Sequence, residues 1–304
     1  MTSALGVLSE VTLKRINVNE KHSDLTGKII RRITRCLLLI TVSISASAHD
    51  PPARLTYESM MAGIGTSSIY DTYLSPLQYG GINLSLTSEL MKTLSIAGGK
   101  VISQQQIDIS FRQAGNRTAT AVSRAGMLQY NYGLFYRFKP YRRLRLYLGA
   151  QPEILLGFIH NNRNTNNPVT GKFHAGINLS AITSVIIPVE TCPIRFSLQV
   201  SAPMTGIMYS PEYGQSYYEI GIGDNNNLIY FSTPQNYINL KGMITIEVPA
   251  GNTTFRFGYL HSLYQTKINS LQTQIRTNTF YVGLSKNILM VPGRKLNKYQ
   301  HVFQ

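Results

Sequence analysis

The stretch "LQYNYGLFYRF", from Leu128 to Phe138, alternates strictly between large apolar and small or polar side chains. Its apolar set is Leu128, Tyr130, Tyr132, Leu134, Tyr136 and Phe138. The opposite set is Gln129, Asn131, Gly133 and Arg137, with Phe135 as the exception. Successive side chains of a β-strand point to opposite faces, so this pattern predicts a strand with one apolar and one polar face.

The same alternation recurs along the chain. In the next segment Leu146 falls on the apolar face and Arg145 on the polar face. We expect ten strands, at residues 55–64, 82–91, 101–113, 124–139, 143–160, 173–189, 194–201, 238–248, 253–265 and 277–288. An additional pairing of "NLIYFS" would raise the number to twelve.

Strand length separates a membrane barrel from a soluble sandwich. The segments around residues 124–139 and 143–160 far exceed the roughly 5–6 residues usual in soluble folds. Only 14% of the residues are charged, against about 25% in typical soluble domains. The sequence therefore predicts an all-β fold, an antiparallel up-and-down transmembrane β-barrel that pairs all its backbone groups by closing on itself.

The connections between the expected strands fall into two classes of length. "KPYRR", "ETCP" and "PAGN" are tight, whereas "DTYLSPLQYG", "HNNRNTNNPVTGK" and the segment at about 203–236 are long. Outer-membrane barrels have short periplasmic turns and long extracellular loops. We therefore expect the first class in the periplasm and the second outside the cell.

A secretory signal precedes the barrel. The stretch "RRITRCLLLITVSISASAHD" has basic residues, a short apolar run and an Ala46-Ser47-Ala48 ending, which is the pattern of a cleaved signal peptide. Residues 1–27 fit no such pattern, and we interpret them as lying upstream of the true start. The expected organisation is a signal at 28–48, a barrel at 49–290 and a basic tail at 291–304. Cleavage near Ala48 removes Cys36 and leaves Cys192 as a single cysteine, so no internal disulfide is expected.

Four stretches resemble a family. "GIGTSSIYDTYLSPLQY", "HNNRNTNNP", "SPEYGQSYYEI" and "FYVGLSK" together resemble a domain-of-unknown-function family of exported Bacteroidetes proteins, from about Tyr57 to Lys286. The resemblance implies a Gram-negative outer-membrane location and no particular activity. The chain departs from that pattern before Lys28, and it has Ile288 where an aromatic residue is usual in the last strand.

The polar faces carry charges. Alternation places Glu58 and Asp108 in the lumen together with Arg112, Arg137, Arg145, Glu153, Arg195, Glu247 and Arg256. A ten-stranded barrel is little wider than the eight-stranded kind that side chains can fill. We expect these charges to pair across the lumen and plug it. The alternative is a narrow pore for small anionic solutes.

One loop is a candidate binding surface. "SPEYGQSYYEIG" brings Tyr213, Tyr217 and Tyr218 close to Gln215 and Glu219. These rings either offer stacking faces to a ligand or pack into the barrel mouth. His261 and Ser262 do not predict a hydrolase, because neighbouring residues on a strand point to opposite faces.

No catalytic, cofactor or metal motif is present, so the chain is expected not to be an enzyme. The sequence predicts a small, monomeric outer-membrane barrel with a structural or surface ligand-binding role. Its expected partners are outer-membrane lipid, lipopolysaccharide and the barrel-assembly machinery, with no nucleic acid despite a net charge of +15. A narrow anion channel is the alternative, and an outer-membrane enzyme of unrecognised type is the third.

Overall fold

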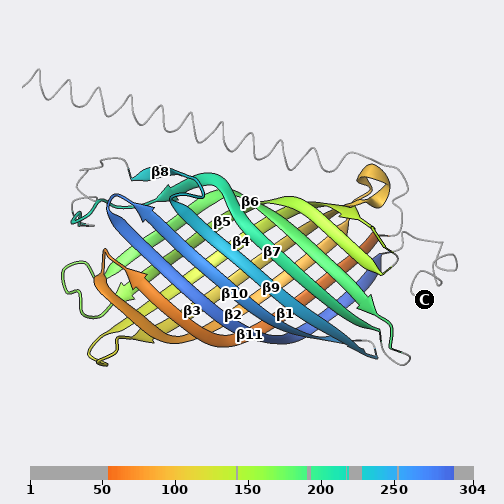
Figure 1. Ribbon diagram of the computed structural model, residues 1–304, viewed down its shortest axis with the longest axis horizontal. Helices are drawn as coiled ribbons and strands as arrows, with labels where there is room; N and C mark the ends of the chain where they lie inside the picture. The colour runs from red at the N-terminus through yellow and green to blue at the C-terminus, as the bar shows by residue number, and fades with distance from the viewer. Residues whose placement is uncertain are drawn as a thin grey trace, which may run out of the picture. The chain divides into compact units, whose positions relative to one another are not determined.

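The computed structural model describes residues 54–141, 143–189, 193–216, 218, 228–251 and 253–290 (Figure 1). The predicted signal peptide, upstream extension and basic tail lie outside these residues. The strands are β1 (Arg54–Asp71), β2 (Ser75–Thr93), β3 (Val101–Gly115), β4 (Val122–Phe138), β5 (Leu144–Asn161), β6 (Val169–Ile187), β7 (Ile194–Tyr209), β8 (Ile229–Ser232), β9 (Tyr237–Ala250), β10 (Thr253–Ile268) and β11 (Leu271–Met290).

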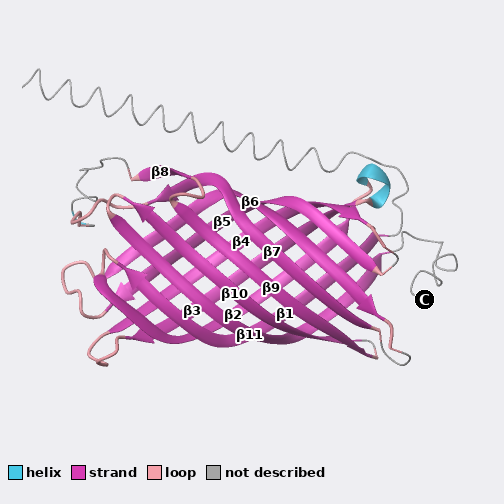
Figure 2. Cartoon of the chain, viewed as in Figure 1, coloured by secondary structure: helices cyan, strands magenta, loops and turns pink. Residues whose placement is uncertain are grey.

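Ten of these strands form a closed antiparallel barrel (Figure 2). β1 pairs with both β2 and β11, each later strand pairs with its neighbour, and β6–β7 and β7–β9 pairings complete the ring. The predicted up-and-down barrel of ten strands is therefore confirmed. β8, which lies within the "NLIYFS" segment, pairs with β7 beyond the part of β7 that pairs with β9, and it is not one of the ten strands that close the ring.

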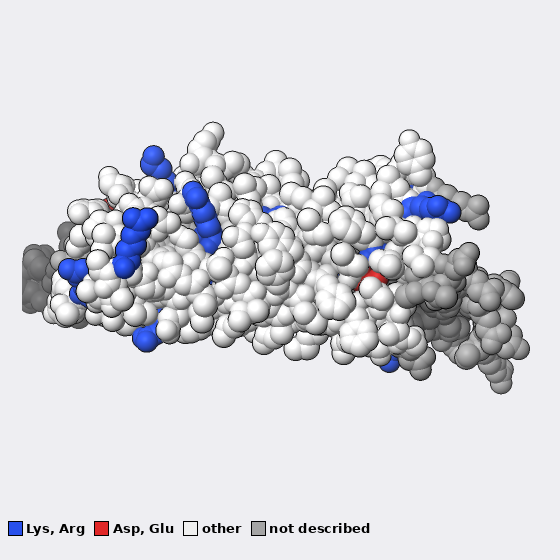
Figure 3. All heavy atoms as spheres, turned by 60° about the horizontal axis from the view of Figure 1, so that its bottom comes forward, with Lys and Arg blue, Asp and Glu red and all other residues white. Residues whose placement is uncertain are grey.

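The outer surface is an apolar belt. On β4 the outward side chains are those of the quoted apolar set, and Leu134 is 48% exposed while Gln129 on the inner face is 6% exposed. Figure 3 shows one side of this surface with few charges along its middle and most of its Lys and Arg side chains toward the ends. A belt of this kind faces lipid in transmembrane barrels. Among the described residues, no helix is long and apolar enough to cross a membrane.

The two ends of the barrel differ in their connections. One end, called here the short-turn end, carries the β4–β5, β6–β7 and β9–β10 turns, the ends Arg54 and Met290, and a short 3-10 helix (Ile96–Gly99) between β2 and β3. The opposite end, called here the long-loop end, carries the tight β1–β2 and β10–β11 turns, the segments 116–121 and 162–168, and the connection between β7 and β9 that includes β8.

The prediction of a long loop at "DTYLSPLQYG" is wrong. β1 continues to Asp71 and β2 begins at Ser75, so three residues make the turn. Asp71 accepts a hydrogen bond from the Tyr73 backbone N–H, and the Tyr73 hydroxyl donates to the Gln215 carbonyl. The polar composition that indicates a loop serves here to close a tight hairpin.

Strand β7 is also longer than predicted, because it continues past Pro203 to Tyr209. Proline lacks a backbone N–H and normally ends a strand or lies at a bulge. Here Pro203 stands opposite Asn178, where the β6–β7 register shifts between Ile177 and Asn178. The irregularity accommodates the proline, and pairing resumes beyond it.

One lumen assignment is wrong. Glu58 lies on the exposed outer face of β1, opposite Lys286 of β11, while its neighbours Tyr57 and Ser59 are buried. The inner face of this strand also carries Met61 and Ile69, so β1 lacks the clean apolar and polar division seen in β4. The alternation rule therefore gave the wrong face for Glu58.

Candidate functional site

A network of ion pairs lies in the lumen at the short-turn end. Arg256 on β10 lies 2.5 Å from Glu89 and 3.6 Å from Glu247, and Arg195 on β7 donates to Glu247 at 3.1 Å. The Tyr57 hydroxyl also donates to Glu247. The structure thus brings together Arg195, Glu247 and Arg256 of the predicted set. Sequence reasoning missed Glu89, although it lies on the inward face of β2.

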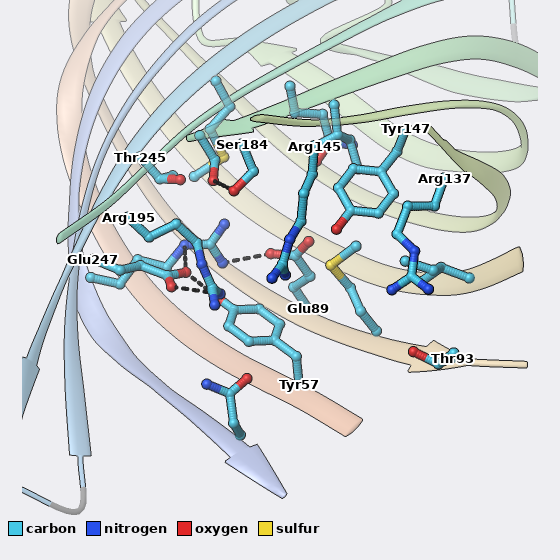
Figure 4. Close-up of a pocket in the computed structure, with 18 residues that line it drawn as sticks. Tyr57, Glu89, Thr93, Arg137, Arg145, Tyr147, Ser184, Arg195, Thr245 and Glu247 are labelled. Atoms are coloured by element: carbon cyan, nitrogen blue, oxygen red, sulfur yellow. Dashed lines mark hydrogen bonds and ion pairs between the residues drawn. The ribbon is translucent and has the colours of Figure 1, made fainter. Parts of the chain in front are cut away.

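A cavity of about 120 Å³ adjoins this network (Figure 4). We call it the vestibule, and its polar lining includes Glu89, Arg137, Arg145, Arg195, Glu247 and Arg256. Tyr57 and Tyr147 also border it. In Figure 4 the arginines come from different strands and extend toward a common space.

Two predicted network members that line the vestibule, Arg137 and Arg145, form no ion pair with the residues that the structure describes. Arg137 donates to the Gly99 carbonyl at 2.8 Å. Arg145 has no hydrogen bond or ion pair with any part of the chain that the structure describes. The expectation that all lumen charges pair is therefore wrong for this end of the barrel.

Glutamine side chains close the inner side of the vestibule. Gln104 donates to Glu89, and it exchanges hydrogen bonds with Gln199 at 3.1 and 3.2 Å across the lumen. Gln151 donates to Gln104 at 2.7 Å. This belt joins β3, β5 and β7. Gln151 and Gln199 of the belt line a smaller cavity of about 20 Å³. A third cavity, of about 40 Å³, shares Asp108 and Lys241 with the second one.

Among the described residues, the middle of the lumen holds one paired cation, Lys241, and one unpaired cation, Arg112. Lys241 contacts Asp108 at 2.9 Å, and Asp108 also accepts from Thr87 and Gln106. Arg112 is 8% exposed and lines the 40 Å³ cavity. Its Nε and Nη1 atoms have no partner among the described residues, so the predicted pairing of Arg112 is also wrong.

Glu153 is the centre of a buried polar cluster toward the long-loop end. Five side chains from β4, β6 and β9 direct hydrogen-bonding atoms at its carboxylate, at distances from 2.5 to 3.2 Å. They are Gln129, His174, Asn178, Tyr237 and Asn239. We call this group the Glu153 cluster. No predicted lumen arginine contacts Glu153; polar donors surround it instead.

His174 connects this cluster to β8. Its Nδ1 lies 3.1 Å from Glu153 Oε1, and its Nε2 lies 3.0 Å from Ser232 Oγ. Because an ionised carboxylate can only accept, Nδ1 donates to Glu153, and Nε2 shares the second hydrogen bond with the serine hydroxyl. The imidazole also stacks on Tyr237, with ring centroids 3.7 Å apart. Sequence reasoning missed His174 and Ser232, which are 58 residues apart.

Glycines make room for the imidazole. Gly176 and Gly206 stand opposite each other on β6 and β7, and Ser232 stands opposite Gly206 on β8. A Cβ atom at Gly206 would lie 2.9 Å from His174 Nε2, and one at Gly176 would lie 2.6 Å from His174 Cε1. The absence of side chains at these positions lets His174 reach Ser232.

A Glu–His–Ser chain is the arrangement that activates serine in hydrolases. Here, however, His174 and Ser232 are each 1% exposed, and the stacked Tyr237 ring is also 1% exposed. A nucleophile needs an acyl group within reach of its oxygen. Burial of all three residues indicates that the Glu153–His174–Ser232 hydrogen bonds fix the packing of side chains in the lumen. Among the described residues, no group of three or more His, Cys, Asp or Glu side chains could hold a metal ion.

The loop candidate is only partly described. Tyr213 is 72% exposed and Tyr218 is 76% exposed, so packing of these two rings into the barrel mouth is wrong. Gln215 caps a turn by accepting from the Glu212 backbone N–H. Tyr217 and Glu219 lie outside the described residues.

The His261–Ser262 pair behaves as strand geometry requires. His261 is exposed and contacts Asn278 at 2.7 Å, whereas Ser262 faces the lumen and hydrogen-bonds to Thr277. The two side chains therefore lie on opposite faces of β10.

A family model for proteins of unknown function, DUF3316, matches residues 33–295. The chain belongs to the DUF3316 family. No curated protein matches the chain. The membership assigns no activity, and an origin in Bacteroidetes stays a prediction.

Several solved outer-membrane barrels have a similar fold. The translocator domain of the autotransporter NalP from Neisseria meningitidis is 9% identical, with coverage of 87% of this chain and 98% of that one and a TM-score of 0.39. The outer-membrane protease OmpT from Escherichia coli is 7% identical, with 80% and 99% coverage and a TM-score of 0.40. The COG4313 outer-membrane channel from Pseudomonas putida F1 is 8% identical, with 80% and 98% coverage and a TM-score of 0.36. The likeness concerns the fold alone.

Proposed function

We propose that this DUF3316 protein is a closed, non-conducting outer-membrane barrel with a structural or ligand-binding role. The observation that carries the proposal is the filling of the long-loop half of the lumen. There the Glu153 cluster adjoins a buried apolar core that includes Ile69, Tyr79, Leu155, Tyr264 and Ile275. Solutes crossing this half would have to displace close-packed side chains and break buried hydrogen bonds.

A narrow anion channel is the second candidate, and the row of cavities favours it. The vestibule and the 20 Å³ cavity share Gln199 and Met243 as lining residues. The 20 and 40 Å³ cavities share Asp108, Lys241, Leu260 and Tyr281. Small movements of these shared residues would connect the three spaces. The apolar core would still separate them from the long-loop end.

Single-channel recording in planar bilayers distinguishes the two functions. The refolded protein should produce no conductance steps, whereas a Tyr237→Ala/Tyr264→Ala variant, which removes two rings from the plug, should conduct if it remains folded. A heat-modifiable mobility shift on gels verifies folding of both proteins. Anion-selective steps from the unaltered protein would reject the closed barrel and establish the channel.

The proposed orientation places the short-turn end and both barrel termini in the periplasm, as in other outer-membrane barrels. It is supported by the connection between β7 and β9, which lies at the other end and is longer in sequence than every connection at the short-turn end. An epitope tag inserted at Thr165 should be labelled by antibody on intact cells, and one at Gly251 should not. Export with cleavage after Ala48, a monomeric state and partners limited to lipid, lipopolysaccharide and the assembly machinery are parts of the same proposal.

The proposal also assigns no catalysis to the Glu153–His174–Ser232 chain. Its support is the burial of these residues beneath Tyr237. A fluorophosphonate probe, which labels activated serines, should leave the folded protein unmodified. Labelling that disappears in Ser232→Ala would instead establish a serine hydrolase.

A further inference from the structure

The vestibule contains more cations than anions. Arg137, Arg145, Arg195 and Arg256 line it against Glu89 and Glu247, which leaves two positive charges over four arginines and two glutamates. Both glutamates are already engaged by the ion pairs with Arg195 and Arg256. The excess charge therefore belongs to Arg137 and Arg145.

Arg145 has the freest guanidinium of the group. It has no partner in the part of the chain that the structure describes, whereas Arg137 donates a hydrogen bond from one of its nitrogens to the Gly99 carbonyl. Both side chains line the same cavity. A guanidinium presents a rigid fork of donors that matches a carboxylate or phosphate, and such charge-assisted bonds are stronger than neutral ones.

The vestibule also has an apolar wall. Met91, Ile102 and Ile182 line it together with the Tyr147 ring, and Ile102, Ile182 and Tyr147 pack with the fully buried Phe135. An inorganic anion would leave this wall without a partner. Binding sites commonly combine an apolar lining with a few placed polar groups.

Size and access limit the ligand further. The volume of about 120 Å³ is smaller than the roughly 300–1,000 Å³ of pockets for drug-sized molecules. The Arg195 side chain keeps 30% of its surface exposed, so solvent reaches the lining. The inner side is closed by the glutamine belt.

We propose that the vestibule binds a small organic anion, with a carboxylate or phosphate at Arg145 and Arg137 and an apolar body against Met91, Ile102 and Ile182. Arg195 and Arg256 compensate the charges of the two glutamates through their ion pairs. This inference goes beyond the closed barrel, since binding here requires no passage through the lumen.

Calorimetric titration of the full-length protein, refolded in vesicles of phosphatidylcholine, tests the proposal. Phenyl phosphate and benzoate should bind, inorganic phosphate should bind more weakly, and neutral benzyl alcohol should not bind. Binding of benzyl alcohol as tightly as benzoate, or no binding by either organic anion, would overturn the proposal.

Two variants locate the site. Arg145→Gln should weaken phenyl phosphate at least about tenfold, which corresponds to the loss of about 1.4 kcal/mol. Arg124→Gln is the matched control because Arg124 is an exposed cation of the adjacent strand β4 that hydrogen-bonds to Gln113. It should leave the affinity unchanged. Equal affinities in both variants, with folding verified by gel mobility, would reject the site.

A lipid headgroup offers the same anionic chemistry as a soluble ligand. Refolding the protein in vesicles that include phosphatidylglycerol separates these two sources. A soluble ligand predicts unchanged phenyl phosphate binding in these vesicles once surface charge is screened by salt. Loss of binding there, but not in phosphatidylcholine, would show that the vestibule takes a lipid headgroup and would overturn the soluble ligand.

Discussion

The two halves of the lumen treat buried charge in opposite ways. In the long-loop half, one carboxylate, Glu153, is surrounded by five hydrogen-bonding side chains and lies against apolar packing. In the short-turn half, four arginines share two carboxylates beside an open space, and Arg145 has no partner among the described residues. In the long-loop half, side chains of the protein compensate the buried charge. In the short-turn half, a positive charge remains that a bound anion could compensate.

This difference suggests that the long-loop half of the lumen contributes to folding stability and the short-turn half to ligand binding. A fully satisfied buried network holds a unique packing, and loss of one member leaves the others without partners. An unpartnered, solvent-reached cation contributes little to folding but can contribute to recognition. Substitutions in the two halves should therefore differ strongly in their effect on the free energy of unfolding.

Removal of the Glu153 carboxylate should have the largest effect. Glu153→Ala leaves buried donors such as Asn178, Asn239 and Tyr237 without their acceptor. We expect a loss of about 3–5 kcal/mol in the free energy of unfolding. Urea unfolding from lipid vesicles measures it. A loss below about 1 kcal/mol would show that the long-loop half does not depend on this carboxylate.

A cation on the outer face should be the next most costly change. Ile154 neighbours Glu153 in sequence but points outward, where it is 49% exposed. Ile154→Arg in the apolar belt should cost roughly 2–4 kcal/mol, because the guanidinium then faces hydrocarbon. The conservative Ile154→Val variant provides the baseline in the same unfolding measurement. If Ile154→Arg is as mild as Ile154→Val, this face does not meet lipid.

A methyl group beneath His174 should have an intermediate effect. The Cβ atom of Gly206→Ala would lie 2.5 Å from the Ala175 carbonyl oxygen and 2.9 Å from His174 Nε2. We expect a loss of about 1–3 kcal/mol from overpacking. Gly80→Ala is the control, because nothing lies within 4 Å of a Cβ there. Equal stabilities for the two variants would show that the position of His174 does not depend on the space left by Gly206.

Arg145 should have the smallest effect on stability. Since Arg145 forms no ion pair among the described residues, Arg145→Gln should change the free energy of unfolding by no more than about 0.5 kcal/mol. Unfolding in low and high salt checks the result. A loss of several kcal/mol would mean that the short-turn half uses this arginine for folding, as the long-loop half uses Glu153.

The barrel could be predicted because its determinants are local. Alternation over residues 128–138 assigns side chains to two faces, and long strands with few charges indicate a membrane wall. Strand ends were less predictable. Asp71, Pro203 and Ser75 resemble loop residues by type, yet the fold extends strands through or up to them by means of a tight turn and a bulge.

The site could be predicted only as a list of inward residues. Arg137, Arg145 and Glu153 follow from alternation, but their partners depend on the register and tilt of distant strands. Tyr237 reaches Glu153 across 84 positions of sequence, and the Arg256–Glu89 pair spans 167. No periodicity within one strand contains this information. Clear alternation is itself lacking in β1, which explains the wrong face for Glu58.

The seam between the first and last strands has a consequence for assembly. β1 and β11 pair along their whole length, from Arg54 with Met290 to Asp71 with Thr273. Contacts between residues so far apart in sequence are slow to form, since the intervening chain must be ordered first. The barrel can close only after Met290 has been synthesised. Until then the edge of β1 that β11 covers in the folded barrel is unpaired, and an unpaired strand edge is prone to aggregation.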